Sequence, residues 1–351
     1  MSKELKAGIV GAGYFSRDHA KAFQALGIPI VAVADVNPQA AERLASEFNI
    51  PQTLTDFRQL TKLDELDIVS VTLPVFLHAP VAIAALNRGK HVLCEKPMAM
   101  NAREARQMAE AAKKARRFVA YGSGRSRYGA APETAKALIA EGKLGQLYRA
   151  DGRHIRRRNR PGIEYQPDTA WWLDSRKSGG GIAIDMAVYH LDLILDLLGW
   201  PAVTTVSATT FQGIPHALPK GTRYDVEEDA NIFIRCGNDL SVSLQLAGAG
   251  NIAYGSDPRV FDEVVVLGSL GGVRINPFAF FTEDMGIPVE VTPAWLNGEG
   301  GTLRIVRELV RAIEHGGPPP ATTADEGVRL MEILDAIYKS ARLGREVRLD
   351  G

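Results

Sequence analysis

The chain has 351 residues, enough for two domains that each bury a core. Its 41 lysines and arginines balance its 41 aspartates and glutamates, which removes any overall electrostatic reason to expect a nucleic acid or an anionic membrane as partner. No run of eighteen apolar residues and no signal peptide is present, so no membrane span is expected. Cys94 and Cys236 lie in apolar runs and indicate buried thiols in a reducing, cytoplasmic setting.

Residues 6–35 carry the strongest local signal. A short apolar strand runs into Gly11 and Gly13, a helical run follows, and the next strand ends at Asp35. Gly11 permits a tight turn, and Gly13 lets a pyrophosphate approach bare backbone at a helix N-terminus. Asp35 comes twenty-two residues after Gly13, where an acid would hydrogen-bond the adenosine ribose. The spacing predicts a dinucleotide site, with Ser16 in place of the usual third glycine.

Strands and helices alternate as far as Tyr121. Asn37 and Asn101 are predicted to cap helices, and a further helix is predicted at 78–88. Apolar runs predict strands at 67–73, 91–94 and 118–121. This alternation predicts a doubly wound parallel sheet, whose ligands bind beyond the carboxyl ends of the strands. The loops of interest are therefore Gly11 to Ser16, Asp35, Leu73 to His78, and Glu95 to Pro97.

Lys96 stands in the sequence Glu95-Lys96-Pro97, directly after a predicted strand. A lysine there could reach a substrate hydroxyl, lower its pKa and stabilise an alkoxide. The alternative is a solvated surface lysine before a loop proline. These residues alone leave both interpretations open.

The pattern changes after Tyr121. Residues 122–129 are predicted to cross between domains, which gives a nucleotide-binding domain at 1–122 and a substrate-binding domain at 123–351. A helix is predicted at 132–141. Strands at 147–154, 231–236 and 240–246 alternate apolar and polar residues, which predicts an antiparallel sheet with one open face. Residues 316–320 are interpreted as a short linker between the last two helices.

Two features of the second half can each be interpreted in two ways. The basic run from Arg156 to Gly162 either binds a carboxylate or phosphate of a substrate or forms a solvated loop. Trp171 and Trp172 either close over nicotinamide or a sugar face, or anchor their loop by burial.

Several segments together resemble the glucose–fructose oxidoreductase / inositol dehydrogenase / MocA family. They are Gly8 to Tyr14, Asp35, Leu73-Pro74 with His78, Ala85 to Val92, Cys94 to Pro97, Gly179 to Gly181 with Asp185, and Ala336 to Tyr338 with Ser340, Gly344 and Val347. Val75 departs from the family, whose members commonly have asparagine after the proline. The resemblance covers nearly the whole chain. It implies an N-terminal Rossmann domain and a C-terminal α+β domain with an open-faced, mostly antiparallel sheet.

The resemblance also implies a function. The expected protein is an NAD(P)-dependent oxidoreductase that moves a hydride between nicotinamide and a sugar, polyol or related hydroxy compound. The expected cofactor contacts are Gly11, Gly13, Tyr14, Phe15, Asp35, Leu73, Pro74, His78, Glu95, Lys96 and Trp172. Asp35 without a neighbouring arginine favours NAD, although NADP stays possible. The open sheet face implies a homodimer or homotetramer. No metal is implied, because no cluster of histidine, cysteine or carboxylate residues has the spacing of metal ligands.

Two other functions occur in the same family. Some members are NAD-dependent glycosidases, and others are cofactor-sensing regulators without catalysis. The intact Glu95-Lys96-Pro97 sequence favours an enzyme over a regulator.

The catalytic residues are expected on the helix that follows Gly179 to Gly181. The resemblance implies that Lys96 polarises the substrate hydroxyl. It also implies that Asp185 either orients the substrate or tunes the residue that exchanges the proton. Family members usually show histidine four residues after this aspartate, but here Tyr189 is fourth and His190 fifth. At about 100° per residue, Tyr189 lies roughly 40° and His190 roughly 140° from Asp185. A regular helix therefore assigns the proton exchange to Tyr189 and leaves His190 packed with one hydrogen bond; a helix that starts after Asp185 would restore His190.

Overall fold

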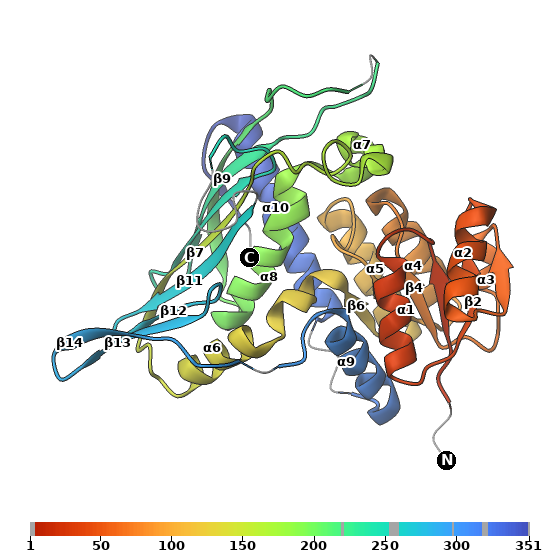
Figure 1. Cartoon of the computed structure of the whole chain (residues 1–351), viewed down its shortest axis with the longest axis horizontal. Coiled ribbons are helices and arrows are strands. Elements are labelled where there is room, and N and C mark those ends of the chain that lie inside the picture. The colour runs from red at the N-terminus through yellow and green to blue at the C-terminus, as the bar shows by residue number, and fades with distance from the viewer. Residues whose placement is uncertain (1–3, 219–220, 253–259, 297, 318–321, 350–351) are drawn as a thin grey trace. The chain divides into compact units, whose positions relative to one another are not determined.

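The computed structural model describes residues 4–218, 221–252, 260–296, 298–317 and 322–349. The chain forms two compact units (Figure 1). The first unit comprises residues 1–125 and 300–331, and the second comprises residues 126–299 and 332–351. Helix α10 (Ala324–Leu343) contributes residues to both. Among the described residues, no helix is both long and apolar enough to cross a membrane.

The first unit is built on six parallel strands in the order β3-β2-β1-β4-β5-β6. The strands are β1 (Ala7–Val10), β2 (Ile30–Ala34), β3 (Gln52–Leu54), β4 (Ile68–Val71), β5 (His91–Cys94) and β6 (Val119–Tyr121). Strands β1 and β4 are buried along their whole length, as expected when helices cover both faces of a sheet. This arrangement confirms the predicted doubly wound sheet.

The helices of this unit begin where the sequence places their caps. Asn37 accepts a hydrogen bond from the Ala40 amide, and Asn101 accepts one from the Glu104 amide. The helices are α1 (Ser16–Ala25), α2 (Pro38–Phe48), α3 (Phe57–Leu60), α4 (His78–Leu86), α5 (Ala102–Ala115) and α9 (Gly301–His315). Helix α9 packs against α1 and β6, so this compact unit takes in residues that the sequence assigned to the second domain. A helical pattern does not reveal which sheet the helix covers.

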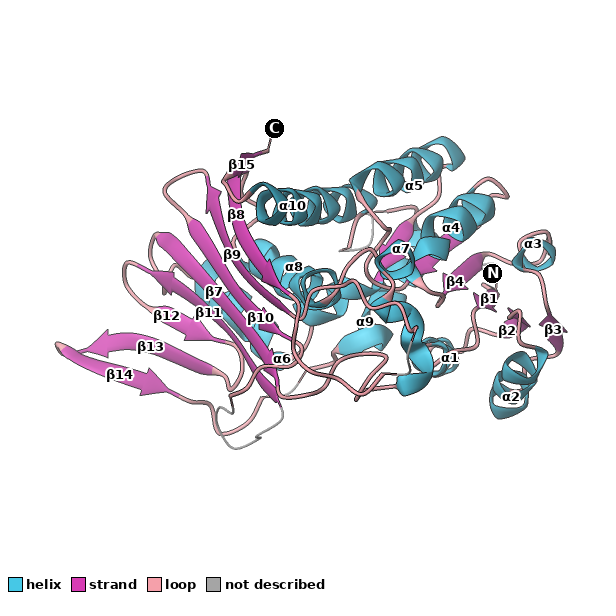
Figure 2. Ribbon diagram, turned by 90° about the horizontal axis from the view of Figure 1, so that it is seen from above, coloured by secondary structure: helices cyan, strands magenta, loops and turns pink. Residues whose placement is uncertain are grey.

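The second unit contains a nine-stranded sheet in the order β14-β13-β12-β11-β7-β10-β9-β8-β15 (Figure 2). Among the described strands of this sheet, only β7 and β10 pair in parallel, so the sheet is mostly antiparallel, as predicted. The strands are β7 (Leu147–Arg156), β8 (Val203–Phe211), β9 (Asp229–Cys236), β10 (Ser241–Ala247), β11 (Val260–Gly268), β12 (Gly272–Arg274), β13 (Ala279–Asp284), β14 (Ile287–Val291) and β15 (Val347–Arg348).

The two faces of this sheet differ in their surroundings. On one face α8 (Val188–Leu197) packs against β7 and β11, and α6 (Ala130–Ala140) packs against α8. Ile232 and Leu244 are buried on the helix side, whereas Phe233 and Gln245, one residue along each strand, are exposed. The alternation predicted for these strands is therefore confirmed. The predicted linker at 316–320 lies partly outside the described residues.

Candidate active site

The glycine-rich loop of the first unit is shaped for a dinucleotide. Gly11 has φ of +97°, and a Cβ there would lie 2.4 Å from the Thr72 carbonyl oxygen. A Cβ on Gly13 would meet no atom within 4 Å, so its backbone borders open space that a pyrophosphate can enter. Ser16 is buried and donates to the Gly13 carbonyl, which keeps the start of α1 close to the loop. These residues fit the phosphate-binding role predicted for them.

Asp35 follows β2 at the edge of this loop. Its Oδ2 accepts from the Ala12 amide at 2.7 Å, and its Oδ1 accepts from the Asn37 amide at 2.8 Å. Both contacts fix the carboxylate beside the glycine-rich loop, where an adenosine ribose would lie. Of the two aromatic side chains expected at the cofactor, Tyr14 is 60% exposed and Phe15 lies edge-on to it.

His78 connects two of the loops expected at the cofactor. Its Nδ1 lies 2.8 Å from the Pro97 carbonyl, and its Nε2 lies 2.7 Å from the Leu73 carbonyl. Burial lowers the pKa of His78, although the two carbonyls act in the opposite direction. The ring therefore holds the loops after β4 and β5 together. Val75, the departure from the family pattern, is completely buried and acts here as a core residue.

Lys96 is buried, with 6% of its surface exposed, which rules out a solvated surface lysine. Its backbone amide donates to Glu95 Oε2 at 3.1 Å, and its peptide bond to Pro97 is cis. Lys96 therefore lies in a loop whose backbone is fixed by the Glu95 carboxylate and, through Pro97, by the His78 ring.

The Glu95 carboxylate is itself held by a buried network. Arg125 Nη2 lies 2.6 Å from both Glu95 oxygens, and His19 Nε2 lies 2.9 Å from Oε1. The other nitrogen of His19 lies 2.7 Å from Ser70 Oγ. Burial raises the pKa of Glu95, but the Arg125 guanidinium and the His19 contact outweigh it and hold that pKa well below its usual range. Glu95 is therefore a fixed anion. The sequence predicted neither His19 nor Arg125, since both meet Glu95 only in the tertiary fold.

In the second unit, two of the three glycines before the predicted catalytic helix, Gly180 and Gly181, allow close packing. A Cβ on Gly180 would lie 1.9 Å from the Tyr338 hydroxyl, and one on Gly181 would lie 2.0 Å from the Glu227 carbonyl. The Glu227 carboxylate accepts from the amides of Gly181 and Ala183 and from the Tyr338 hydroxyl. The glycines and the C-terminal tyrosine, two separate landmarks of the sequence, thus form one contact that caps this helix.

The helix after the glycines is not regular. Residues Ala183–Ala187 form a π-helical turn, and α-helical geometry begins at Val188. Asp185 lies inside the π turn, so the angles calculated for a regular helix are wrong, because a π turn is wider and bonds residue i to i+5. Because α-helical geometry starts after Asp185, the condition that restores His190 as a candidate is met, and the choice between Tyr189 and His190 must come from their contacts.

His190 is enclosed by protein. Its Nδ1 lies 3.0 Å from the Met186 carbonyl, and its Nε2 lies 2.9 Å from Asp262 Oδ1. Only 4% of its surface is exposed, and it makes two contacts where one was expected. Tyr189 is partly exposed and lines a pocket of about 210 Å³ together with His190, Asp262 and Asn276. Asp185 lies 3.3 Å from Arg156 Nη1.

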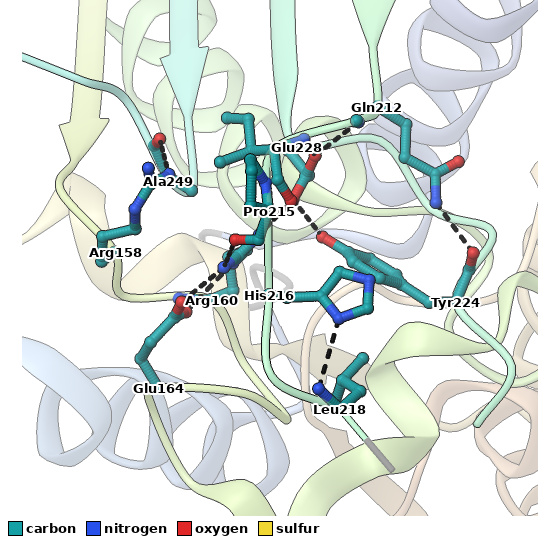
Figure 3. Close-up of polar contacts among 12 residues, drawn as sticks. Arg158, Arg160, Glu164, Gln212, Pro215, His216, Leu218, Tyr224, Glu228 and Ala249 are labelled. Atoms are coloured by element: carbon teal, nitrogen blue, oxygen red, sulfur yellow. Dashed lines mark hydrogen bonds and ion pairs between the residues drawn. The ribbon is translucent and has the colours of Figure 1, made fainter. Parts of the chain in front are cut away.

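The basic run 156–162 is divided among different partners. Arg160 pairs with Glu164 and Glu228, and Glu228 also accepts from the Tyr224 hydroxyl at 2.5 Å (Figure 3). Two carboxylates thus more than neutralise the single charge of Arg160. Arg156 faces Asp185. Arg157 is exposed, so the solvated-loop interpretation applies to that residue.

The two tryptophans of the adjoining loop are stacked on each other. The ring centroids of Trp171 and Trp172 lie 4.4 Å apart at an interplanar angle of 25°. Trp172 also borders a small pocket together with Asp185 and Tyr224. Its predicted contact with the cofactor stays a prediction.

The loop geometry and the parallel sheet define a dinucleotide-binding protein. Residues 5–123 match the model of an oxidoreductase family with an NAD-binding Rossmann fold, and residues 133–274 match the GFO/IDH/MocA C-terminal domain. The chain belongs to the Gfo/Idh/MocA family, which confirms the resemblance. It is an NAD-dependent enzyme of the dehydrogenase type.

Two curated relatives match along nearly their whole length. D-glucoside 3-dehydrogenase of Escherichia coli (strain K12) is 28% identical over 99% of this chain and 98% of its own. Levoglucosan dehydrogenase of Pseudarthrobacter phenanthrenivorans is 26% identical over 97% of this chain and 96% of its own. Among solved structures, GenD2 from gentamicin A biosynthesis in complex with NAD has a TM-score of 0.82 at 26% identity, covering 100% of this chain and 98% of that one.

Proposed function

We propose that the protein transfers a hydride to or from a sugar, a polyol or a related hydroxy compound, and that Lys96 polarises the reacting hydroxyl. The full-length relatives are named for glucoside and levoglucosan substrates. The observation that carries the assignment of Lys96 is its burial beside the Glu95 anion. An ammonium group held there can lower the pKa of a hydroxyl and stabilise the alkoxide.

In this proposal Tyr189 exchanges the proton of the reacting hydroxyl, and Asp185 orients the substrate. His190 already has a partner at each ring nitrogen, which disfavours it as the group that exchanges a proton with substrate. Tyr189 precedes it, is partly exposed and borders the 210 Å³ pocket. Asp185 is buried beside Arg156 and lines the small pocket of Trp172 and Tyr224, where its carboxylate can accept hydrogen bonds from substrate hydroxyls. The chemistry that bound NAD supplies is hydride transfer.

We also propose that copies of the chain assemble through the open face of the nine-stranded sheet. The face carries Phe233 between polar side chains and is hollowed by a pocket of about 610 Å³ that β8, β9, β10 and the end of α10 line. The partner is a second copy of this chain.

A substrate panel tests the proposed reaction. Sugars, sugar acids and inositols are each incubated with NAD or NADP while the absorbance of reduced nicotinamide is followed. We expect turnover with at least one hydroxy compound and NAD. Release of sugar from a glycoside without net reduced cofactor would instead identify a glycosidase. NAD binding without turnover of any compound would identify a cofactor-sensing regulator.

A further inference from the structure

Three side chains that are distant in sequence meet beneath α8. His154 lies on β7, Asp262 lies directly opposite it on the antiparallel partner β11, and His190 comes from α8, which packs on both strands. Asp262 Oδ1 lies 2.9 Å from His154 Nδ1 and 2.9 Å from His190 Nε2. All three potential ligand atoms lie within 4.8 Å of one another. The register of the sheet and the packing of α8 therefore create a cluster that no spacing in the sequence indicated.

A neutral His190 ring cannot account for both of its contacts, the one with the Met186 carbonyl and the one with the Asp262 carboxylate. Met186 offers a carbonyl oxygen, which only accepts, so Nδ1 must carry the proton. In that tautomer Nε2 presents a lone pair to the Asp262 carboxylate, which also only accepts. Two acceptors 2.9 Å apart need either a proton or a metal ion between them.

The surroundings of His190 match those of a metal ligand, whereas the second ring nitrogen of His154 is buried without a hydrogen-bond partner among the described residues. A ligating histidine commonly donates its other N–H to a backbone carbonyl, as His190 does to Met186. The Asp262 side chain is 42% exposed and, with Tyr189 and Asn276, lines the 210 Å³ pocket, which provides an entry path and space for a further ligand. The positive charge of Arg156 repels a cation, but the Asp185 carboxylate pairs with Arg156 and offsets this charge.

We propose that His154, His190 and Asp262 form a binding site for a divalent transition metal of the zinc class, with a fourth position open to the pocket. Two imidazoles and one carboxylate suit Zn²⁺, whereas Mg²⁺ and Ca²⁺ prefer oxygen ligands. Bonds of about 2.0–2.1 Å to a tetrahedral ion place the ligand atoms about 3.3 Å apart. The two contacts of Asp262 with the histidines would therefore lengthen from 2.9 Å by a few tenths of an ångström. The ion would attach α8 to β7 and β11 beside Tyr189.

Metal binding by the full chain without an affinity tag tests the site. Protein stripped with a chelator is titrated with Zn²⁺ by calorimetry, its metal content is measured by mass spectrometry after dialysis, and Co²⁺ is added as a spectroscopic probe. We expect one ion per chain and the intense visible absorption of tetrahedral Co²⁺. Asp262→Asn, which keeps the shape of the side chain, should weaken Zn²⁺ binding by more than the about 10–100-fold that loss of an outer-shell partner costs.

Matched variants distinguish this metal site from binding elsewhere on the chain. His154→Gln should weaken binding as Asp262→Asn does, while His216→Asn, on an exposed loop, should bind as the parent does. Circular dichroism of each variant shows whether it folds. Equal Zn²⁺ binding by the parent and a folded Asp262→Asn variant would overturn the proposal, as would no binding by the parent. Dehydrogenase turnover by metal-free enzyme would leave the proposed function intact, so the two proposals fail separately.

Discussion

The loop that carries Lys96 is fixed by charge as well as by backbone. Arg125 bonds the Glu95 carboxylate and also lies over the Phe15 ring, with its guanidinium carbon 5.4 Å from the ring centroid. A Cβ on Gly122 would lie 2.7 Å from Arg125 Nη2 and 3.0 Å from Glu95 Oε2, so glycine at that position lets the pair form. The network thereby connects the glycine-rich loop with the Lys96 loop inside the first unit.

Replacing Lys96 by methionine should remove the charge while keeping most of the side-chain volume. We expect NAD affinity to remain near that of the parent and kcat to fall by about 10²–10⁴-fold, the range for a lost acid–base group. Calorimetric titration with NAD and the rate of nicotinamide reduction give the two quantities. Lys113→Met, on the exposed side of α5, is the matched control. Turnover close to that of the parent would show that Lys96 has no part in the chemistry.

Asp35 should make the enzyme prefer NAD. Its carboxylate is held by two backbone amides beside the loop, so a 2′-phosphate would meet a fixed negative charge. Titration with both cofactors should show tighter binding of NAD than of NADP. Asp35→Ser should narrow this difference in affinity by improving the binding of NADP. Tighter binding of NADP by the parent would contradict this assignment.

His91 should make stability fall in mild acid. Burial, assisted by Arg117, lowers its pKa to about 4, and its Nδ1 accepts the Phe118 amide, which a protonated nitrogen cannot do. Between the ordinary histidine value of about 6.5 and about 4, the unfolded chain binds a proton that the folded chain does not. The free energy of unfolding should therefore decrease as the pH falls through this window.

Denaturant unfolding at several pH values measures this effect. His91→Asn places an amide oxygen where Nδ1 accepts, so it should reduce the loss of stability between about pH 6.5 and about pH 4 relative to the parent. His216→Asn is the control that also lacks one histidine. An unchanged acid dependence in His91→Asn would show that other groups cause it.

At the scale of elements, regular patterns were predictable and the irregular helix start was not. Strand β5 has the predicted bounds, and Asn37 and Asn101 cap α2 and α5, because periodicity and capping are local properties. The π turn at Ala183–Ala187 forms beside contacts from Glu227 and Tyr338, which lie far away in the sequence. The Glu95 network and the cluster around Asp262 were missed for the same reason: their partners meet only in the folded chain.

The helix that starts with this π turn gives a direct comparison of its two candidate residues. Tyr189→Phe removes only a hydroxyl and should abolish most turnover without loss of stability. His190→Asn should mainly lower the melting temperature, because it disturbs the contacts with Met186 and Asp262. In a profile of kcat against pH, the basic limb of the parent should lie above the pH range in which an ordinary histidine titrates. Loss of turnover in a normally folded His190→Asn, with Tyr189→Phe active, would reverse the assignment.

At the scale of the whole molecule, the sequence predicted both sheets and the family but not how the C-terminal helices are shared. Helix α9 belongs to the first compact unit, and α10 contributes to both. The apolar pattern that predicts each helix contains no information about its partner. The alternating strands, in contrast, predicted an exposed sheet face, and its exposed apolar side chains lead to a prediction about assembly.

Phe233 should mark the contact between copies of the chain. It is 36% exposed at the middle of β9 and lines the hollow of the open face, where a second sheet face would remove its ring from water. Phe233→Arg would place a buried, unpaired charge in that interface, beside the existing Arg235, and should therefore oppose association. Light scattering after size exclusion should give the parent a mass that is a multiple of 38.1 kDa and the variant a mass of 38.1 kDa. Met285→Arg, at the 89% exposed tip between β13 and β14, should keep the mass of the parent. A monomeric parent, or an unchanged mass for Phe233→Arg, would show that the chain does not associate through this face.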